Sequence, residues 1–314
     1  MGVIAIAAVF FLILVGGVVR ASGAGMGCPD WPKCFGRWIP PTDVSQLPAD
    51  YQEIYAHRGY GDTEFNAFKT WTEYLNRLVG VSIGLLIFAT LILSLAYWST
   101  DRVIVAVSFA SFILVGFNGW LGSVIVATNL VPVIITLHMV AALLVVGTLV
   151  YAVARSNRVN GAIEVVQRSG TIPWIIGLAI ALSFVQLVLG TQVREQVDEI
   201  AKAMGDANRA SWANEFGKAF LAHRSLSIPI LVANIALAAA IGRHTAQNSA
   251  LRRSAYALLA IIAAEIAVGV LLYYAGMPAV LQPLHLLLSA LLFGAQFYIL
   301  ILYRMARKEP APIV

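Results

Sequence analysis

Residues 73–98 read EYLNRLVGVSIGLLIFATLILSLAYW, and this stretch decides the class of fold. Most of it is an unbroken apolar run, close to the ~20 residues that an α-helix needs to cross a bilayer. Its first turn and a half nevertheless carries the side chains of Glu73, Asn76 and Arg77. Charge inside a bilayer is costly, so such residues in a membrane helix indicate function. These three residues are therefore candidate site residues.

The rest of the chain has the composition of a multi-pass membrane protein. Of its 314 residues, 60% are hydrophobic and only 12% are charged. The apolar runs lack the alternation of barrel strands, so we expect helices, which satisfy their own backbone hydrogen bonds in lipid. Eight runs are long enough: about 2–20, 73–98, 103–127, 132–153, 172–192, 219–242, 253–274 and 282–303. The first run lacks a basic start and a cleavage site, which favours a retained helix over a signal peptide.

Basic residues predict the orientation of these helices. Lys and Arg are concentrated in the short connections 99–102, 154–171 and 243–252 and in the tail 304–314. Since short cytoplasmic loops carry excess positive charge, both termini are expected in the cytoplasm and the loops 21–72 and 193–218 outside. The net charge of +5 then reflects topology, and no nucleic-acid partner is expected.

The chain has two cysteines, Cys28 and Cys34, which lie in the segment CPDWPKC of the first outer loop. The outward side of a bacterial inner membrane is oxidising, so a disulfide is allowed there. A structural staple and a redox-active dithiol both fit this motif, and the motif does not separate them.

The sequence is an internal repeat. With a shift of 147 residues, Asn76 aligns with His223, His138 aligns with His285, and LGSVIVATNLVPVIITLHM (121–139) aligns with VGVLLYYAGMPAVLQPLHL without a gap. GGVVR (16–20) matches GTQVR (190–194) with a shift of 174, so the first outer loop is 27 residues longer than its counterpart. We therefore predict an all-α membrane protein with two tandem four-helix bundles, related by a pseudo-two-fold axis along the membrane normal. The halves are 1–153 and 172–304, and 154–171 is a cytoplasmic linker.

Three histidines occupy repeat-related positions near the outer helix ends: His138, His223 and His285. Bundle cores hold cofactors between facing helices, and haem takes axial His ligands. His223 and His285 therefore predict a bis-histidine haem site. Interhelical hydrogen bonding is the alternative for a single intramembrane histidine. A proton or ion relay is the other reason for buried His and Glu.

Four arginines fit the same picture. Arg77 and Arg224 directly follow the ligand positions, and Arg20 and Arg194 end the first helix of each half. A guanidinium group binds a carboxylate bidentately, so these residues are candidate partners of haem propionates. The alternative is that they extend to the membrane interface.

The two halves differ at the ligand positions. Glu73 aligns with Phe220, and Asn76, whose amide is a poor iron ligand, aligns with His223. The second half therefore resembles a closed, six-coordinate electron-transfer site. The first half offers His138 and an open face near Glu73, on the same helix side as Asn76. We expect the first half to be the reactive one.

At these residues the chain resembles the haem A synthase family. The resemblance runs from GGVVRASGAGMGCPDWPKC through WTEYLNRLVG, TLHM, LGTQVRE and FLAHRSLS to PLHLLLS. It implies an eight-helix oxidoreductase that converts a ring methyl of haem O to a formyl group by successive hydroxylations, giving haem A for cytochrome oxidase. One departure is Asn76, where many members have His.

The resemblance also assigns residues and partners. His223 and His285 would ligate a haem b cofactor, and the substrate haem would lie beside His138 and Glu73. The family's paired outer-loop cysteines match Cys28 and Cys34. Haem O synthase would supply the substrate in the bacterial inner membrane. The electron partner and a homo-oligomeric state are left open.

Two other functions remain as alternatives. One is a di-haem membrane cytochrome b that acts only in electron transfer. The other is a transporter with His and Glu as proton relays, which predicts helices broken at mid-membrane. Glu265, which aligns with Asn118, is either an interhelical partner or part of a polar path. Four glutamines are expected to bond between helices: Gln186, Gln192, Gln282 and Gln296.

Overall fold

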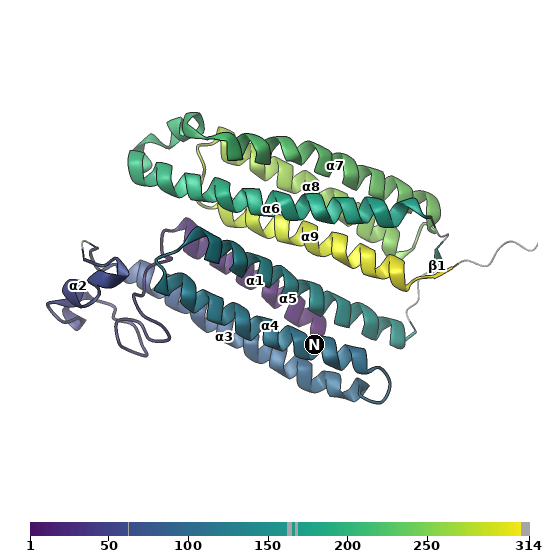
Figure 1. Cartoon of the computed structure of the whole chain (residues 1–314), viewed down its shortest axis with the longest axis horizontal. Coiled ribbons are helices and arrows are strands. Elements are labelled where there is room, and N and C mark those ends of the chain that lie inside the picture. Colours follow the sequence, from purple (N-terminus) through teal and green to yellow (C-terminus); the bar gives the residue numbers. More distant parts are fainter. Residues whose placement is uncertain (62, 162–164, 167–168, 309–314) are drawn as a thin grey trace, which may run out of the picture.

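The computed structural model describes residues 1–61, 63–161, 165–166 and 169–308. Eight of its helices are long and apolar enough to cross a membrane, which confirms the predicted number of spans (Figure 1). They are α1 (Gly2–Ala21), α3 (Ala67–Ser94), α4 (Arg102–Ala127), α5 (Pro132–Val159), α6 (Thr171–Met204), α7 (Lys218–His244), α8 (Ala250–Tyr274) and α9 (Leu281–Met305). The chain is thus an all-helical, multi-pass membrane protein.

Short elements complete the described chain. The first outer loop contains α2 (Tyr51–Ile54) and the 3-10 turns Val44–Gln46 and Ala56–Arg58. A further 3-10 turn, Leu95–Tyr97, continues α3, and β1 (Val165–Val166) pairs in parallel with β2 (Arg307–Lys308). The predicted linker therefore pairs with the segment after α9. Residues 162–164 and 167–168 of that linker lie outside the described residues.

Several helices begin where a side chain caps them. Asn66 accepts a hydrogen bond from the Lys69 backbone N–H and so starts α3. Asp101 and Ser249 cap α4 and α8 in the same way. These short polar side chains satisfy backbone donors that have no partner within the helix. Because α3 starts at Ala67 rather than at 73, Glu73 lies well inside the helix.

The prediction of an outer loop over 193–218 is wrong for most of that range. Helix α6 continues to Met204, and a 3-10 helix follows over Asp206–Glu215. The segment after Arg194 consists mainly of good helix formers, and its Val197 packs with the buried Trp212. At ~1.5 Å per residue, α6 is therefore longer than the ~30 Å hydrocarbon core and extends beyond it.

The long helices form two groups in sequence order (Figure 1). In the first half, α1 packs on α3, α3 on α4, α4 on α5 and α5 on α1. In the second half, α6 packs on α7, α7 on α8, α8 on α9 and α9 on α6. The halves meet where α1 and α5 contact α9 and where α5 contacts α6.

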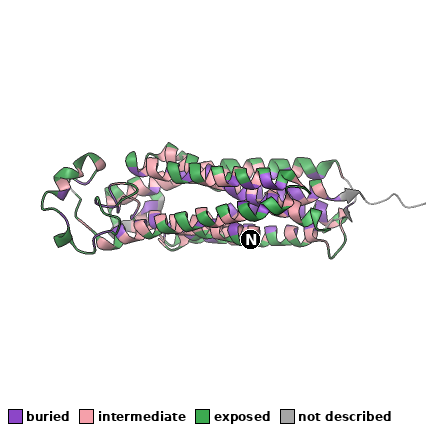
Figure 2. Ribbon diagram, turned by 90° about the horizontal axis from the view of Figure 1, so that it is seen from below, coloured by how far each residue is buried: buried purple, intermediate pink, exposed green. Residues whose placement is uncertain are grey.

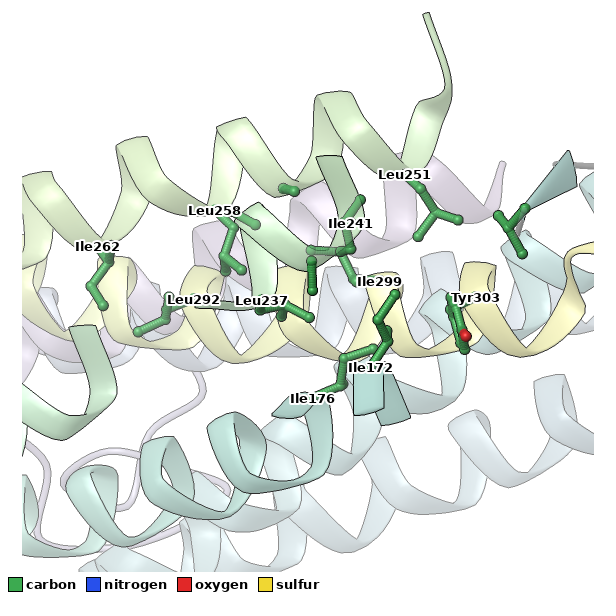
Figure 3. Close-up of a cluster of buried hydrophobic side chains, with 14 of the residues drawn as sticks. Ile172, Ile176, Leu237, Ile241, Leu251, Leu258, Ile262, Leu292, Ile299 and Tyr303 are labelled. Atoms are coloured by element: carbon green, nitrogen blue, oxygen red, sulfur yellow. The ribbon is translucent and has the colours of Figure 1, made fainter. Parts of the chain in front are cut away.

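Buried apolar side chains fill the end of each half that is remote from the histidines. In the second half this cluster includes Ile172, Ile176, Leu237, Ile241, Leu258 and Ile299 (Figure 3). In the first half it includes Ala5, Val9, Ile83, Ile87, Val146 and Leu149. Figure 2 shows exposed residues along the outward sides of the helices, many of them large and apolar. Such a surface suits lipid, since water-soluble proteins rarely expose apolar patches of this extent.

Candidate functional site

His223 and His285 lie together near the first turns of α7 and α9. Their ring centroids are 6.2 Å apart, and the ring planes are inclined at 75°. A metal between two imidazoles, with metal–nitrogen bonds of ~2 Å and each nitrogen ~1 Å from its ring centre, separates the centroids by ~6 Å. The donor pair that the sequence singled out therefore fits the two axial positions of a haem iron.

A glycine lies against each of these rings. A Cβ atom at Gly190 would be 3.3 Å from Cε1 of His223, and one at Gly269 would be 3.2 Å from Cε1 of His285. These distances are tighter than ordinary contacts, so any larger residue would push the imidazole out of place. At His138 the corresponding glycine is Gly122, and the distance is 3.6 Å.

A polar residue comes four positions before each of these glycines. The backbone of Asn118 lies near the ring of His138, that of Gln186 near the ring of His223, and that of Glu265 near the ring of His285. The Nδ1 atoms of the three rings nevertheless have no hydrogen-bond partner among the described residues. A polar residue followed four positions later by glycine is thus a sequence pattern that marks the helix turn against which each imidazole ring packs. The aligned segments that begin at residue 121 contain one such match, Gly122 with Gly269. The position equivalent to Gln186 in the first half is Leu12, before Gly16.

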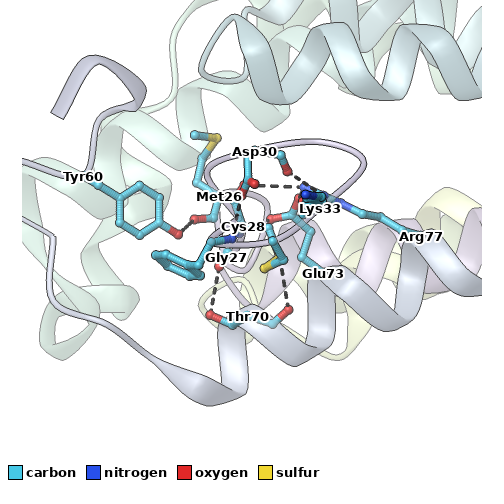
Figure 4. Close-up of polar contacts among 11 residues, drawn as sticks. Met26, Gly27, Cys28, Asp30, Lys33, Tyr60, Thr70, Glu73 and Arg77 are labelled. Carbon is cyan, nitrogen blue, oxygen red and sulfur yellow. Dashed lines mark hydrogen bonds and ion pairs between the residues drawn. A yellow bond between two sulfur atoms is a disulfide. The ribbon is translucent and has the colours of Figure 1, made fainter. Parts of the chain in front are cut away.

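Glu73 lies on α3 beneath the first outer loop and is only 4% exposed. Its Oε2 accepts a hydrogen bond from the Cys28 backbone N–H at 2.9 Å. Its Oε1 pairs with the guanidinium of Arg77, one turn further along α3. Arg77 also donates to the carbonyl oxygens of Asp30 at 2.7 Å and Lys33 at 3.0 Å (Figure 4). Both carboxylate oxygens therefore have donors, and the same pair anchors the loop.

Cys28 and Cys34 form a disulfide, as predicted, with their Cα atoms 4.9 Å apart. The loop beside it is pressed onto α3, since Thr70 Oγ1 donates to the Gly27 carbonyl at 2.8 Å. A Cβ atom at Gly27 would be 2.2 Å from the Lys69 carbonyl oxygen, so only glycine fits this approach. The disulfide and Gly27 together hold the Cys28 N–H at the carboxylate of Glu73.

The first outer loop has its own aromatic core. Phe35, which adopts a φ of +53°, lies edge-on to Tyr51, Tyr55, Tyr60 and Phe65. The Tyr60 hydroxyl donates to the Met26 carbonyl (Figure 4). Burial raises the pKa of Tyr60 above its usual range, so this donor stays protonated. We call residues 26–61 and 63–66 the outer cap, because they form a folded layer over Glu73.

The predicted propionate partners lie in three different settings. Arg20 and Arg194 converge on Asp198, at 3.0 Å and 2.7 Å, which joins α1 to α6. Arg77 is engaged with Glu73 and the outer cap. Arg224 is exposed, with its guanidinium carbon 6.0 Å from the centroid of the Phe220 ring. The sequence analysis missed Asp198, because the repeat alignment does not pair it with another charged or polar residue.

Asn76 and His138 carry buried polar atoms with no hydrogen-bond partner among the described residues. These atoms are the Oδ1 of Asn76 and the Nδ1 of His138. Polar atoms of this kind are costly unless they serve a purpose. His138 lies on α5 and Asn76 and Glu73 lie on α3, and both helices pack on α1 and α4. The imidazole is a candidate iron ligand, and the carboxylate is a candidate acid–base or charge-stabilising group.

Fold and site together define a multi-pass helical membrane protein with paired imidazoles in its second half and a buried carboxylate in its first. The sequence model of the COX15-CtaA family, described as cytochrome oxidase assembly protein, matches residues 1–297. The chain belongs to this family.

Curated relatives carry the name Heme A synthase. The protein of Shewanella oneidensis is 27% identical over 146 residues, which cover 46% of this chain and 42% of that protein. The protein of Sinorhizobium fredii is 30% identical over 202 residues, covering 59% and 53% respectively. That of Bartonella bacilliformis is 30% identical over 154 residues, covering 44% and 42%. The chain thus spans about half the length of these relatives, or less.

Proposed function

We propose that this protein is a haem A synthase, an oxidoreductase that converts a methyl group of haem O to a formyl group by successive hydroxylations. The haem A produced would serve cytochrome oxidase. Family membership and the relatives' name support this activity. The observation that carries it is the asymmetry of the halves: two imidazoles 6.2 Å apart in one, and a buried, clamped carboxylate in the other.

The proposed architecture is two tandem four-helix bundles, 1–153 and 172–304, joined by the linker 154–171. A pseudo-two-fold axis along the membrane normal would relate them. The same closed packing order in α1, α3–α5 and in α6–α9 supports this arrangement. Both termini would face the cytoplasm of a bacterium, so that the outer cap and its disulfide lie outside the inner membrane.

In the second half, His223 and His285 would hold haem b, which supplies one-electron transfer when it is bound. Gly190 and Gly269 would set the positions of the two rings. Arg224, exposed beside His223, would meet a propionate. Arg20 and Arg194, which both pair with Asp198, would lie at the outer end of the same haem b site. The partner that donates or accepts electrons is not assigned.

In the first half, His138 would ligate the iron of the substrate haem O, and Asn76 would leave the opposite side without a strong ligand. Glu73 would act on the reacting methyl, either by stabilising positive charge that develops there or by accepting a proton from attacking water. The Cys28 N–H and Arg77 would fix the direction of its carboxylate. Because the Cys28 N–H that binds Glu73 belongs to a disulfide-bonded residue, this hydrogen bond favours a structural role of the disulfide over a redox-active one.

The deciding experiment is to extract and identify by mass the haems bound to the purified protein, expressed with and without a haem O synthase. We expect haem b alone without that partner. With it, we expect additional haem O, its hydroxylated form or haem A. This result would also support haem O synthase as the source of substrate.

Haem b alone in both preparations would overturn the proposed activity and leave the membrane cytochrome b alternative. That alternative is disfavoured here because Asn76 stands in the first half where the second half has His223, and an amide is a poor ligand for a second six-coordinate haem. A colourless protein in both preparations would instead indicate a transporter.

A further inference from the structure

Glu265 is a carboxyl group inside a membrane helix, where charge and polarity are costly. It lies in α8, which packs against α9. Its Oε1 is 3.3 Å from Nδ1 of His285, and the two side chains are 14% and 26% exposed. Its Oε2 and the Nδ1 of His285 are both buried and have no hydrogen-bond partner among the described residues, so the 3.3 Å approach is an ion-pair contact and not a formed hydrogen bond. The contact with the imidazole is therefore what the structure offers as a reason for this carboxyl.

The backbone around Glu265 brings the ring to this carboxyl. Gly269 follows Glu265 by one helical turn, so both residues lie on the same side of α8. A Cβ atom at Gly269 would be 3.2 Å from Cε1 of His285, which shows how closely the ring approaches the helix. The ring is thus held between the glycine and the carboxyl, with Nδ1 toward Glu265.

The other two histidines have no such partner among the described residues. At the repeat position of Glu265 the first half has Asn118, whose Oδ1 is buried and unpaired. Beside His223, the side chain of Gln186 donates to the backbone carbonyl of His223 at 3.0 Å rather than to its ring. Only one of the three rings is therefore supported by a carboxyl.

We propose that Glu265 is a positioning residue: when haem is bound, it accepts the Nδ1–H of His285, fixes the tautomer that leaves Nε2 for the iron, and lowers the reduction potential of the haem held there. This inference rests on the proposed haem b site. It deepens that proposal by assigning control of the haem potential to one residue of the second half.

The physical reason is the electron supply to the ligand. A histidine that binds a metal commonly donates its other ring N–H to a carboxylate, which fixes the ring and makes it a stronger donor. A stronger donor stabilises the ferric state more than the ferrous state, so the potential falls. An amide at the same position can still accept the N–H but supplies less electron density. An apolar side chain does neither.

The test is a redox titration of the haem-loaded, full-length protein with three substitutions: Glu265→Asp, Glu265→Gln and Glu265→Leu. We expect Glu265→Gln to shift the ferric–ferrous equilibrium about tenfold toward the ferrous form. Glu265→Leu should shift it further and broaden the low-spin electron paramagnetic resonance signal, because the ring loses its fixed orientation. Glu265→Asp should stay nearest to the unsubstituted protein. The matched control is Asn118→Leu, which should leave the haem b potential unchanged.

Unchanged potential and resonance signal in Glu265→Gln would overturn the inference, and this variant decides the question if Glu265→Leu does not fold. If Glu265 had only a structural role, its substitution would lower the yield of folded protein. The reduction potential of the haem in the folded fraction would not change. Absence of a low-spin, bis-histidine haem from the unsubstituted protein would be a different result. It would overturn the proposed haem b site itself, and the positioning role with it.

Discussion

The two halves differ most clearly at one level of their cores. In the second half, Gln296 Nε2 donates to Ser183 Oγ at 2.9 Å and to Asn234 Oδ1 at 3.0 Å, and all three residues are buried. The repeat equivalents in the first half are Val9, Ile87 and Leu149, which are buried in an apolar cluster. Three positions on three helices thus differ together, as expected if a buried polar network is either complete or absent.

This polar trio lies under the paired histidines. Asn234 and Gln296 come eleven residues after His223 and His285, about three helical turns and therefore on nearly the same helix face. The second half ties its ligand helices together from within. The first half has apolar residues at these three positions, and a hydrogen bond from Ser111 to Thr148 joins α4 to α5 at the same level. Its α3 is held from outside, through the outer cap on Glu73 and Arg77. The candidate haem b half and the candidate substrate half are therefore stabilised in different places.

The largest expected effect separates the histidines of the two halves. His285→Ala should remove the low-spin haem b spectrum completely, because a bis-histidine site cannot form with one imidazole. His138→Ala should keep that spectrum and lose retained haem O or haem A. Absorption spectra and haem extraction of both variants measure this. Loss of haem b in His138→Ala would show that the halves are not separate sites.

Glu73→Gln tests the reactive side of the comparison. We expect conversion of haem O to fall about 1,000-fold, the upper range for removal of a preorganised charged group, with the haem b spectrum intact. Product haems quantified by mass give the readout. Glu64→Gln, which alters an exposed carboxylate of the outer cap, is the matched control and should retain conversion. Unimpaired conversion in Glu73→Gln would rule out the catalytic assignment.

Gly27→Ala should act on Glu73 from a distance. The added methyl would lie 2.2 Å from the Lys69 carbonyl, so the outer cap must move and withdraw the Cys28 N–H from the carboxylate. A misplacement of about 1 Å can lower a rate about 100-fold, and we expect a loss of that order in haem A formation. Gly25→Ala, whose Cβ meets only Leu130 at 3.4 Å, is the control. Equal activity of the two variants would separate the cap from catalysis.

The smallest expected effect concerns the polar trio. Gln296→Leu alone should destabilise the protein by about 1–3 kcal/mol, because Ser183 and Asn234 lose their partner in a buried setting. The triple variant Ser183→Val, Asn234→Ile and Gln296→Leu copies the first half and should recover most of that loss. Thermal unfolding in detergent measures both. If the triple variant were less stable than Gln296→Leu by the separate effects of Ser183→Val and Asn234→Ile, the trio would not be a connected unit.

Much of the fold could be predicted from the sequence, because membrane spans are set by apolar runs. The eight spans and the Cys28–Cys34 disulfide are confirmed. Of the glutamines expected to bond between helices, Gln186, Gln282 and Gln296 do so. The extension of α6 to Met204 was missed, because beyond the membrane a polar helix has no long apolar run to mark it.

The candidate site could be predicted only in part. The repeat marked His138, His223, His285 and Glu73, but their chemical roles stay predictions. The backbone N–H of Cys28 at Glu73 comes from 45 residues away and leaves no trace in side-chain pattern. The contact of Glu265 with His285 required the packing of α8 on α9. Side-chain identity therefore located the positions, and only three-dimensional packing supplied their partners.

Gly16 retains the room that a ring would need. It is the repeat equivalent of Gly190, yet no heavy atom of the described residues outside its own helix neighbourhood lies within 4 Å of a Cβ built there. By analogy with Gly190 and His223, we expect α1 to leave space for an imidazole at position 76. Asparagine and histidine codons differ by one base, so a single point mutation would place a histidine at the repeat position of His223. The proposed difference between an open and a closed haem site in this chain therefore depends on one nucleotide.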